Sequence, residues 1–150
     1  MKPESISLRV LKIKLSIKAE KRVKHRIKQI TRRSRGVSLD QVIGELNRYL
    51  KGWLGYFRLI ETPSTLRDLD SWIRRRLRCF MMKRWINNCH TRYRALRALG
   101  VSDQNARPVA GFRKGPWVLS HIQPVRVAMP NRFFADKGLL FLLHGYESLQ

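Results

Sequence analysis

One continuous stretch, residues 46–57, limits the possible folds of this chain more than any other. Its sequence is Leu-Asn-Arg-Tyr-Leu-Lys-Gly-Trp-Leu-Gly-Tyr-Phe, and apolar side chains fall three, four, seven, eight and eleven residues after Leu46. That spacing is typical of a helix with one buried face. Ser38 and Gln41 have the spacing of a capping box, which predicts a helix from residue 39 to about 59. We therefore expect a small helical domain organised around this helix.

The charge of the chain points to a polyanionic partner. Lysine and arginine number 32 against 10 acidic residues, a formal net charge of +22, and such a surface repels itself until a polyanion neutralises it. The chain is 43% hydrophobic, so it is still expected to fold. The candidate partners are RNA, DNA and an anionic membrane. A membrane is the weakest of the three, because no segment reaches the ~20 apolar residues of a transmembrane helix and the N-terminus lacks the apolar core of a signal peptide.

The two cysteines, Cys79 and Cys89, indicate a reducing compartment rather than a disulfide framework. The expected location is the cytoplasm of a bacterium, with an organellar origin as the alternative. The cysteines are ten residues apart and no second close cysteine or histidine pair accompanies them, so the sequence predicts no metal site. No glycine-rich loop fits a phosphate-binding fingerprint, and we expect no cofactor.

Local patterns predict a mostly α fold. Residues 6–17 alternate between apolar and polar side chains, which predicts a short β-strand or hairpin at the edge of an incomplete sheet. Helical periodicity and stop signals predict helices over residues 18–33, 39–59, 64–86 and 91–99. Three of these helices are long enough to form a small bundle.

The last third of the chain is expected to be a region of short helices and loops. Residues 101–116 are predicted to be mostly loop, because Pro108 interrupts any helix there. Short helices are predicted after Pro124 and after Asn131, which we expect to be an N-cap, and the apolar residues 139–143 are predicted to pack back on the core. The predicted domains are a strand remnant at 1–17, a helical domain at 18–100 and a C-terminal extension at 101–150.

Basic side chains gather at the predicted helices and form the candidate binding surface. Helical spacing places Arg67, Arg74, Arg75 and Arg78 on one face of the predicted third helix. Arginine suits RNA, because its planar fork binds two phosphate oxygens and stacks on bases. The alternative is a solvated charged face with no partner. The predicted RNA-binding residues are Arg32, Arg33, Arg35, Arg67, Arg74, Arg75, Arg78, Lys83, Arg84 and Lys114.

Several motifs resemble those of the group II intron maturase-specific domain, and they follow one another in the order of that family. They are the stretch at 46–57, Arg-Gly-Val-Ser-Leu at 35–39, Leu-Asp-Ser-Trp-Ile-Arg-Arg-Arg-Leu-Arg at 69–78, Lys-Arg-Trp at 83–85, Lys-Gly-Pro-Trp-Val-Leu-Ser at 114–120 and Asn-Arg-Phe-Phe at 131–134. The family's proteins are intron-encoded reverse transcriptases with a fingers-palm domain followed by a helical thumb. The resemblance implies a thumb whose basic helices bind group II intron RNA and assist its splicing, with the strand at 6–17 matching the last hairpin of the palm.

The sequence departs from the family's polymerases in its acidic residues. The palm's paired catalytic aspartates are absent, and Asp68 and Asp70 form the closest acidic pair. On a helix these two side chains point about 200° apart, so they cannot share a metal ion as polymerase carboxylates do. We interpret them as acids that favour a helix N-terminus, and we expect the chain not to be an enzyme.

Two other functions remain as hypotheses. In the first hypothesis, the chain is the C-terminal fragment of an RNA-directed DNA polymerase. Such a fragment is either inactive alone or one half of a split enzyme whose palm is a separate polypeptide. Alternatively, it is a DNA-binding accessory of a mobile element. An upstream reading frame that encodes an Asp-Asp pair would indicate the polymerase fragment. A preference for duplex DNA over intron RNA would indicate the DNA-binding accessory.

Overall fold

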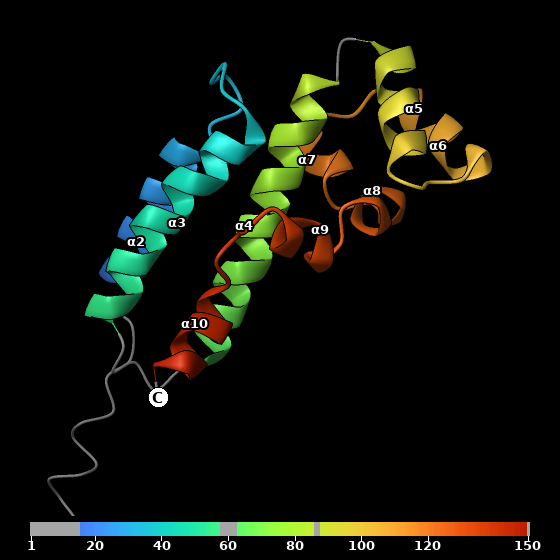
Figure 1. Cartoon of the computed structure of the whole chain (residues 1–150). Coiled ribbons are helices and arrows are strands. Elements are labelled where there is room, and N and C mark those ends of the chain that lie inside the picture. Colours follow the sequence, from blue (N-terminus) through green and yellow to red (C-terminus); the bar gives the residue numbers. More distant parts are fainter. Residues whose placement is uncertain (1–15, 58–62, 86–87, 150) are drawn as a thin grey trace, which may run out of the picture.

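The computed structural model describes residues 16–57, 63–85 and 88–149, and within these ranges every regular element is a helix. The mostly α prediction is confirmed. The helices, shown in Figure 1, are α2 (Ile17–Ile30), α3 (Leu39–Tyr56), α4 (Pro63–Arg84), α5 (Cys89–Ala98), α6 (Asp103–Ala110), α7 (Pro116–Leu119), α8 (Gln123–Ala128), α9 (Asn131–Asp136) and α10 (Leu142–Ser148). The predicted strand lies outside the described residues, apart from its last two positions. There Ser16 caps α2 and Ile17 is already helical.

The three long helices begin and end near the positions that their sequences predict. Ser38 Oγ accepts a hydrogen bond from the backbone N–H of Gln41 at 3.1 Å, so the expected cap of α3 is present. Val23, Ile27 and Ile30 form the buried line of α2, and its basic residues lie on the opposite face. The helices α2, α3 and α4 run up, down and up beside one another (Figure 1).

The buried face of α3 is the centre of the core, as its periodicity predicted. Leu46, Leu50, Trp53 and Leu54 are all buried, and α10 returns from the end of the chain to pack against α3 and α4. The approach of α10 is close, because a Cβ placed on Gly145 would lie 2.7 Å from a methyl group of Leu54.

Hydrogen bonds from side chains of α3 and α4 hold the C-terminal segment in that position. The Asp70 carboxylate accepts backbone hydrogen bonds from Leu142 at 2.7 Å and from Leu143 at 3.0 Å. The interpretation of Asp68 and Asp70 as acids at the start of their own helix is wrong, because α4 begins at Pro63 and has no acid in its first turn. Asp70 instead accepts from the first backbone amides of α10. Asn47 on α3 bonds the backbone of Gly138 and Leu140 in the same way. The expected packing of the closing segment on the core is confirmed.

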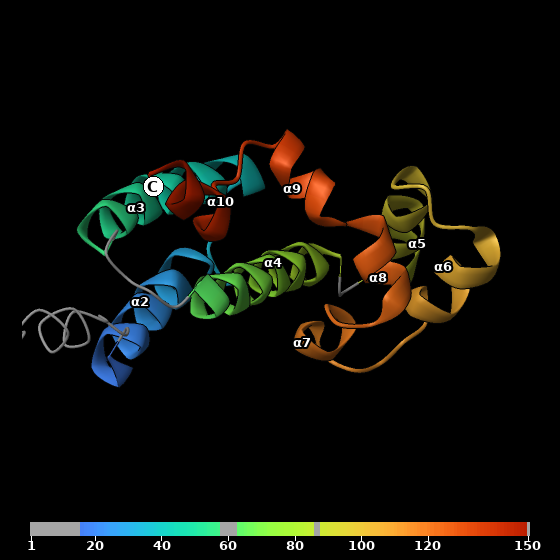
Figure 2. The same ribbon diagram turned by 90° about the horizontal axis from the view of Figure 1, so that it is seen from below.

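The region after α4 is more helical than the sequence predicted. The helices α5 and α6 lie together beyond the end of α4, and α7, α8 and α9 lead back along it (Figure 2). The loop prediction for 101–116 is wrong over α6, because Ser102 caps the helix and Arg92 bonds the carbonyls of Val109 and Ala110 at its end. Tertiary packing thus overrides the break expected at Pro108.

A smaller correction concerns α9. Asn131 is its first residue, and Pro130 takes the cap position without a side-chain bond. Gly138, with φ +85°, ends this helix where the sequence predicted, in the left-handed conformation that favours glycine.

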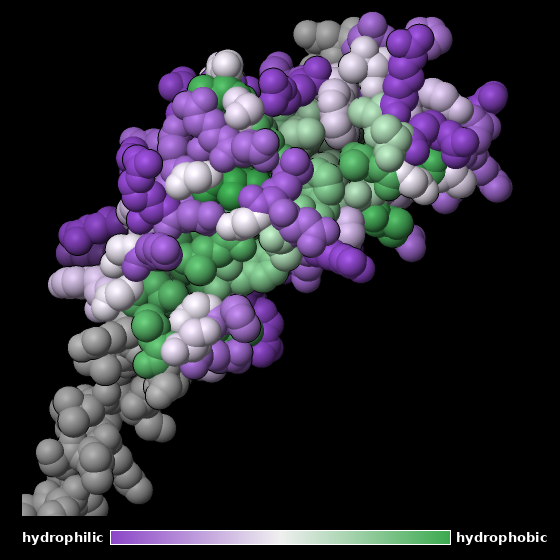
Figure 3. Space-filling model, viewed as in Figure 1, coloured by the Kyte–Doolittle hydropathy of each residue, from purple (hydrophilic) through white to green (hydrophobic). Residues whose placement is uncertain are grey.

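Polar residues dominate the outside of the molecule. In the face shown in Figure 3, hydrophilic side chains flank a narrower band of apolar ones. Among the described residues, no helix has the length and apolar character needed to cross a membrane.

Candidate nucleic-acid interface

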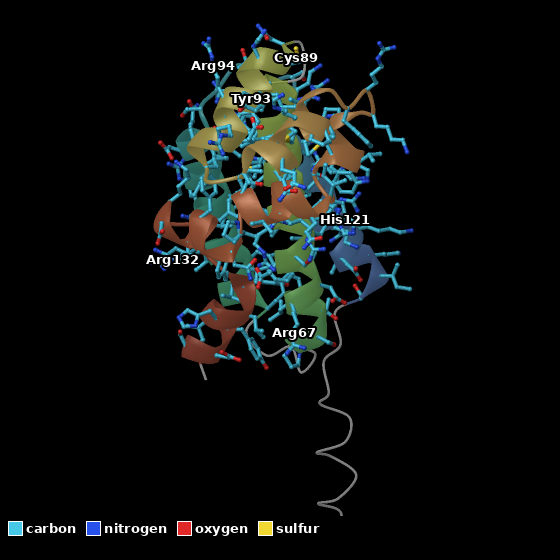
Figure 4. The ribbon with its side chains drawn as sticks, turned by 90° about the vertical axis from the view of Figure 1, so that its right-hand side faces the viewer. Arg67, Cys89, Tyr93, Arg94, His121 and Arg132 are labelled. Carbon is cyan, nitrogen blue, oxygen red and sulfur yellow. The ribbon has the colours of Figure 1, made fainter. Side chains whose placement is uncertain are left out.

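Two adjoining hollows on the surface are lined by arginines from α4 and from the α7–α9 region. One has a volume of about 440 Å³ and lies over the middle of α4, and the other, of about 750 Å³, lies between α4 and α8–α9. Arg78, Arg126 and Asn131 line both hollows, so the two form one continuous surface. We call it the arginine groove and define it by Arg74, Arg75, Arg78, Arg126 and Arg132. Figure 4 looks along this side of the molecule, with Arg67 low on α4 and with His121 and Arg132 on opposite flanks.

Helical spacing explains how α4 supplies one wall of the groove. Arg67, Ser71, Arg74 and Arg78 follow one another at three- and four-residue intervals, and Arg75 lies beside them. The predicted clustering of Arg74, Arg75 and Arg78 is therefore observed. Arg67 is exposed on the same face of α4 but lies outside the two hollows.

Arg78 is the floor of the groove, and its burial was not predicted. Its side chain is only 9% exposed, and Nε donates to the carbonyl of Met129 at 2.9 Å. Its guanidinium carbon lies 5.6 Å from the ring centre of Phe134. Burial, and then repulsion from Arg74 and Arg126, lowers the pKa of Arg78 from its usual value to about 10. Arg78 therefore binds the C-terminal extension to α4 and also places a positive charge in the groove.

Arg75 connects α4 to the segment around α7. Its guanidinium stacks on Trp117 at 3.8 Å from the ring centre and donates to the Trp117 carbonyl at 3.1 Å. The stacking fixes the plane of the guanidinium at the edge of the groove. Arg75 and Arg78 were predicted only as binding residues, and the structure shows that both also secure the C-terminal extension.

The groove has little opposing negative charge. Asp68 is the carboxylate among its lining residues. Asp70 is buried against the start of α10, with its pKa raised mainly by burial while the two amide bonds oppose the rise. Arg132 and Asp136 approach to 3.8 Å, but both side chains are largely exposed, so solvent screens the pair. The arginines therefore repel one another across the groove until an anion enters.

The other predicted binding residues do not line the groove. Arg32 and Arg33 are exposed just after α2, and Lys83, Arg84 and Lys114 are exposed near the far end of α4 and in the α6–α7 loop. Arg35 is different, because both of its Nη atoms bond Glu45 at 2.8 Å and Nη1 also bonds the carbonyl of Ile30. Arg35 therefore joins α2 to α3, and most of its donors are already used.

Sequence reasoning missed the second wall of the groove. His121, Gln123, Arg126, Asn131 and Arg132 line it from the C-terminal extension. The motif at residues 131–134 placed Asn131 and Arg132 within the family resemblance, but nothing in the linear order indicated that they face α4. Their role depends on the chain turning back along α4.

The architecture and the basic groove are consistent with one family of proteins. The sequence matches the model of the group II intron, maturase-specific domain over residues 20–100. The chain belongs to this family. The resemblance seen in the motifs is thereby confirmed, and no curated protein matches the chain significantly. The maturase-specific domain covers α2 to α5 and includes the α4 wall of the groove, whereas the second wall lies in the extension that follows it.

The described residues contain no group of three or more His, Cys, Asp or Glu side chains placed to hold a metal ion. Cys79 is buried and Cys89 exposed, and both are free thiols. Burial raises the pKa of the Cys79 thiol and favours its protonated form.

Proposed function

We propose that this protein is a non-catalytic RNA-binding module that binds a group II intron RNA and assists its splicing. The observation that carries the proposal is the arginine groove, built on the maturase-specific domain of a chain with a formal net charge of +22. Guanidinium groups from two directions suit an RNA backbone, because structured RNA is recognised largely through phosphates and shape. Trp72, which lines the groove, adds an aromatic surface.

The test is binding of a fluorescently labelled group II intron RNA over a range of salt concentrations. If each groove arginine neutralises one phosphate, the logarithm of the association constant should fall against the logarithm of salt with a slope of roughly −3.5 to −4.5. Additional exposed cations, such as those of α2, would make the slope steeper. An affinity that does not change with salt would contradict the electrostatic mechanism.

A matched pair of variants separates the groove from the charge of the whole molecule. Arg126→Gln with Arg132→Gln removes two exposed groove charges, and Arg48→Gln with Arg94→Gln removes two exposed charges elsewhere. We expect the groove pair to weaken RNA binding by at least tenfold more than the control pair. A splicing assay with the same variants should show the same order. Equal losses would mean that RNA is held by diffuse charge instead of by the groove.

Duplex DNA is the competitor that distinguishes the DNA-binding alternative. The proposed function predicts that unlabelled intron RNA displaces the labelled RNA at lower concentration than duplex DNA of equal phosphate content. Stronger competition by DNA would favour an accessory role in DNA binding.

The split-enzyme hypothesis has one observation in its favour. Ile17 at the start of α2 and Tyr56 at the end of α3 are 74% and 83% exposed, and the antiparallel helices place them at the same end of the bundle (Figure 1). A separate palm polypeptide is a candidate to cover them. Reverse transcription by this protein mixed with a palm polypeptide encoded upstream, but by neither alone, would support that function.

A further inference from the structure

The two walls of the arginine groove belong to different parts of the chain. Arg74, Arg75 and Arg78 come from α4, within the maturase-specific domain, whereas Arg126 and Arg132 come from the extension. The α4 arginines already hold that extension, since Arg75 bonds the carbonyl of Trp117 and Arg78 that of Met129. A ligand between the walls would therefore touch the same side chains that dock the extension.

Arg78 has donors left for such a ligand. Its Nε is used by Met129 O at 2.9 Å, and no acceptor in the described part of the chain pairs with Nη1 or Nη2. The side chain lines both hollows of the groove. Arg78 as a whole is 9% exposed and its Nε is held by the Met129 carbonyl, so the side chain would lose little conformational freedom when it binds an anion.

The electrostatics favour an anion with oxygens that face several directions. Arg74 and Arg126 both repel Arg78, and an anion between them would replace this repulsion with attraction. A tetrahedral phosphate can accept from guanidinium groups on both walls. The two hollows have volumes of about 440 and 750 Å³, which leave room for more than one phosphate. The shared lining by Arg78 and Arg126 would let successive phosphates of one strand occupy them.

We propose that the arginine groove binds consecutive phosphates of the RNA backbone at Arg78 and Arg126, and that this binding locks the C-terminal extension onto α4. The inference rests on the proposed function for the source of the phosphates. It adds a defined anion site and a coupling, because the RNA supplies the counter-charge between arginines of the two walls, whose guanidinium groups otherwise repel each other. If bound RNA stabilises the docked extension, linkage requires that docking of the extension strengthens RNA binding by the same free energy.

The first experiment uses inorganic pyrophosphate as the probe and limited trypsin digestion as the readout. Arg113 and Lys114 lie exposed in the loop that joins α6 to the α7–α9 wall. We expect pyrophosphate to slow cleavage at this loop severalfold in the wild-type protein, relative to sodium chloride at equal ionic strength. Protection by sodium chloride to the same extent would overturn the site, because it would show screening without specific binding.

Single variants then test the residues. Arg126→Gln removes an exposed groove charge, and Arg94→Gln on α5 is the control of equal charge. Arg78→Lys keeps the charge of the floor but loses the fork. We expect Arg126→Gln and Arg78→Lys to weaken pyrophosphate affinity by about tenfold or more, and Arg94→Gln by less than about twofold. Equal effects of Arg126→Gln and Arg94→Gln would overturn the proposal.

Labelled intron RNA separates this inference from the proposed function. If wild-type protein binds the RNA and Arg126→Gln binds it equally well without losing the trypsin protection, the groove is not the site although the RNA-binding function stands. If wild-type protein shows no salt-dependent RNA binding but still binds pyrophosphate as predicted, the proposed function fails and the anion site remains. Circular dichroism of each variant should match the wild type, and Arg126→Gln, which removes an exposed side chain, keeps the test independent of folding.

Discussion

Replacing Arg78 with methionine tests whether the floor of the groove is kept for stability or for binding. Burial and repulsion lower its pKa to about 10, well below the usual arginine value, which corresponds to about 3 kcal/mol of unfavourable free energy for the charged side chain in the folded protein. The charge-assisted bond to Met129 O returns about 1.5–3 kcal/mol. The two effects nearly cancel. Methionine fills much of the same space against Phe134, so Arg78→Met should change the free energy of unfolding by less than about 1.5 kcal/mol.

Arg78→Ala provides the contrast. Like methionine, alanine removes the charge and the donor to the Met129 carbonyl, but alanine also leaves a cavity beside Phe134, so we expect a loss of about 2–4 kcal/mol. Urea unfolding followed by tryptophan fluorescence and circular dichroism measures both variants. If Arg78→Met is destabilised as strongly as Arg78→Ala, the guanidinium is a net stabiliser and the near-cancellation of the two effects is refuted. If it folds normally, its RNA affinity should still fall by at least about tenfold, because the buried donors are gone.

Three further predictions concern stability. Gly52 is an exposed residue within α3, with open space where a Cβ would stand. Gly52→Ala should therefore raise the free energy of urea unfolding by about 1 kcal/mol. Gly100→Ala should lower it, because Gly100 has φ +92°. Hydrogen bonding to Arg35 lowers the pKa of Glu45 in the folded protein. The stabilisation by this ion pair is therefore fully present above the unfolded pKa near 4.5 and is lost as pH falls through the folded pKa. Glu45→Gln should lower the free energy of unfolding by about 1 kcal/mol at pH 7 and by little at acid pH. Burial raises the pKa of Asp70 above 3.8, so the folded state holds that proton more tightly and stability should decrease as pH rises between the two pKa values. Unfolding of Asp70→Asn over that pH range should lack the decrease, and an unchanged pH profile would show that another group is responsible.

The helices that carry their own signals were predictable, and the short ones were predictable only in part. The periodic apolar residues of α3 and its Ser38 cap are local features, so both the helix and its buried face followed from the sequence. The helix α6 did not, because the packing that tolerates Pro108 comes from Arg92, on another helix. Asp70 was misinterpreted for the same reason, since its partners at Leu142 and Leu143 are far away in the sequence.

The candidate site shows the same division. Helical spacing correctly predicted that Arg74, Arg75 and Arg78 lie close together, because residues three and four apart share a helix face. It did not reveal that Arg78 is buried or that Arg35 is occupied by Glu45. Both outcomes depend on which neighbouring element covers the side chain, and local spacing contains no information about that.

The sequence by itself determined that this is a basic, mostly helical chain of the maturase family with a central apolar helix at 46–57. Charge depends on composition and periodicity on local order, so both can be read from the sequence without knowledge of the fold. Only the tertiary structure decided which cations form a site. It folds the extension back along α4, so that Arg126 and Arg132 face Arg78 across a groove. That juxtaposition of like charges arises from long-range packing, and it is what makes the groove a place for an anion.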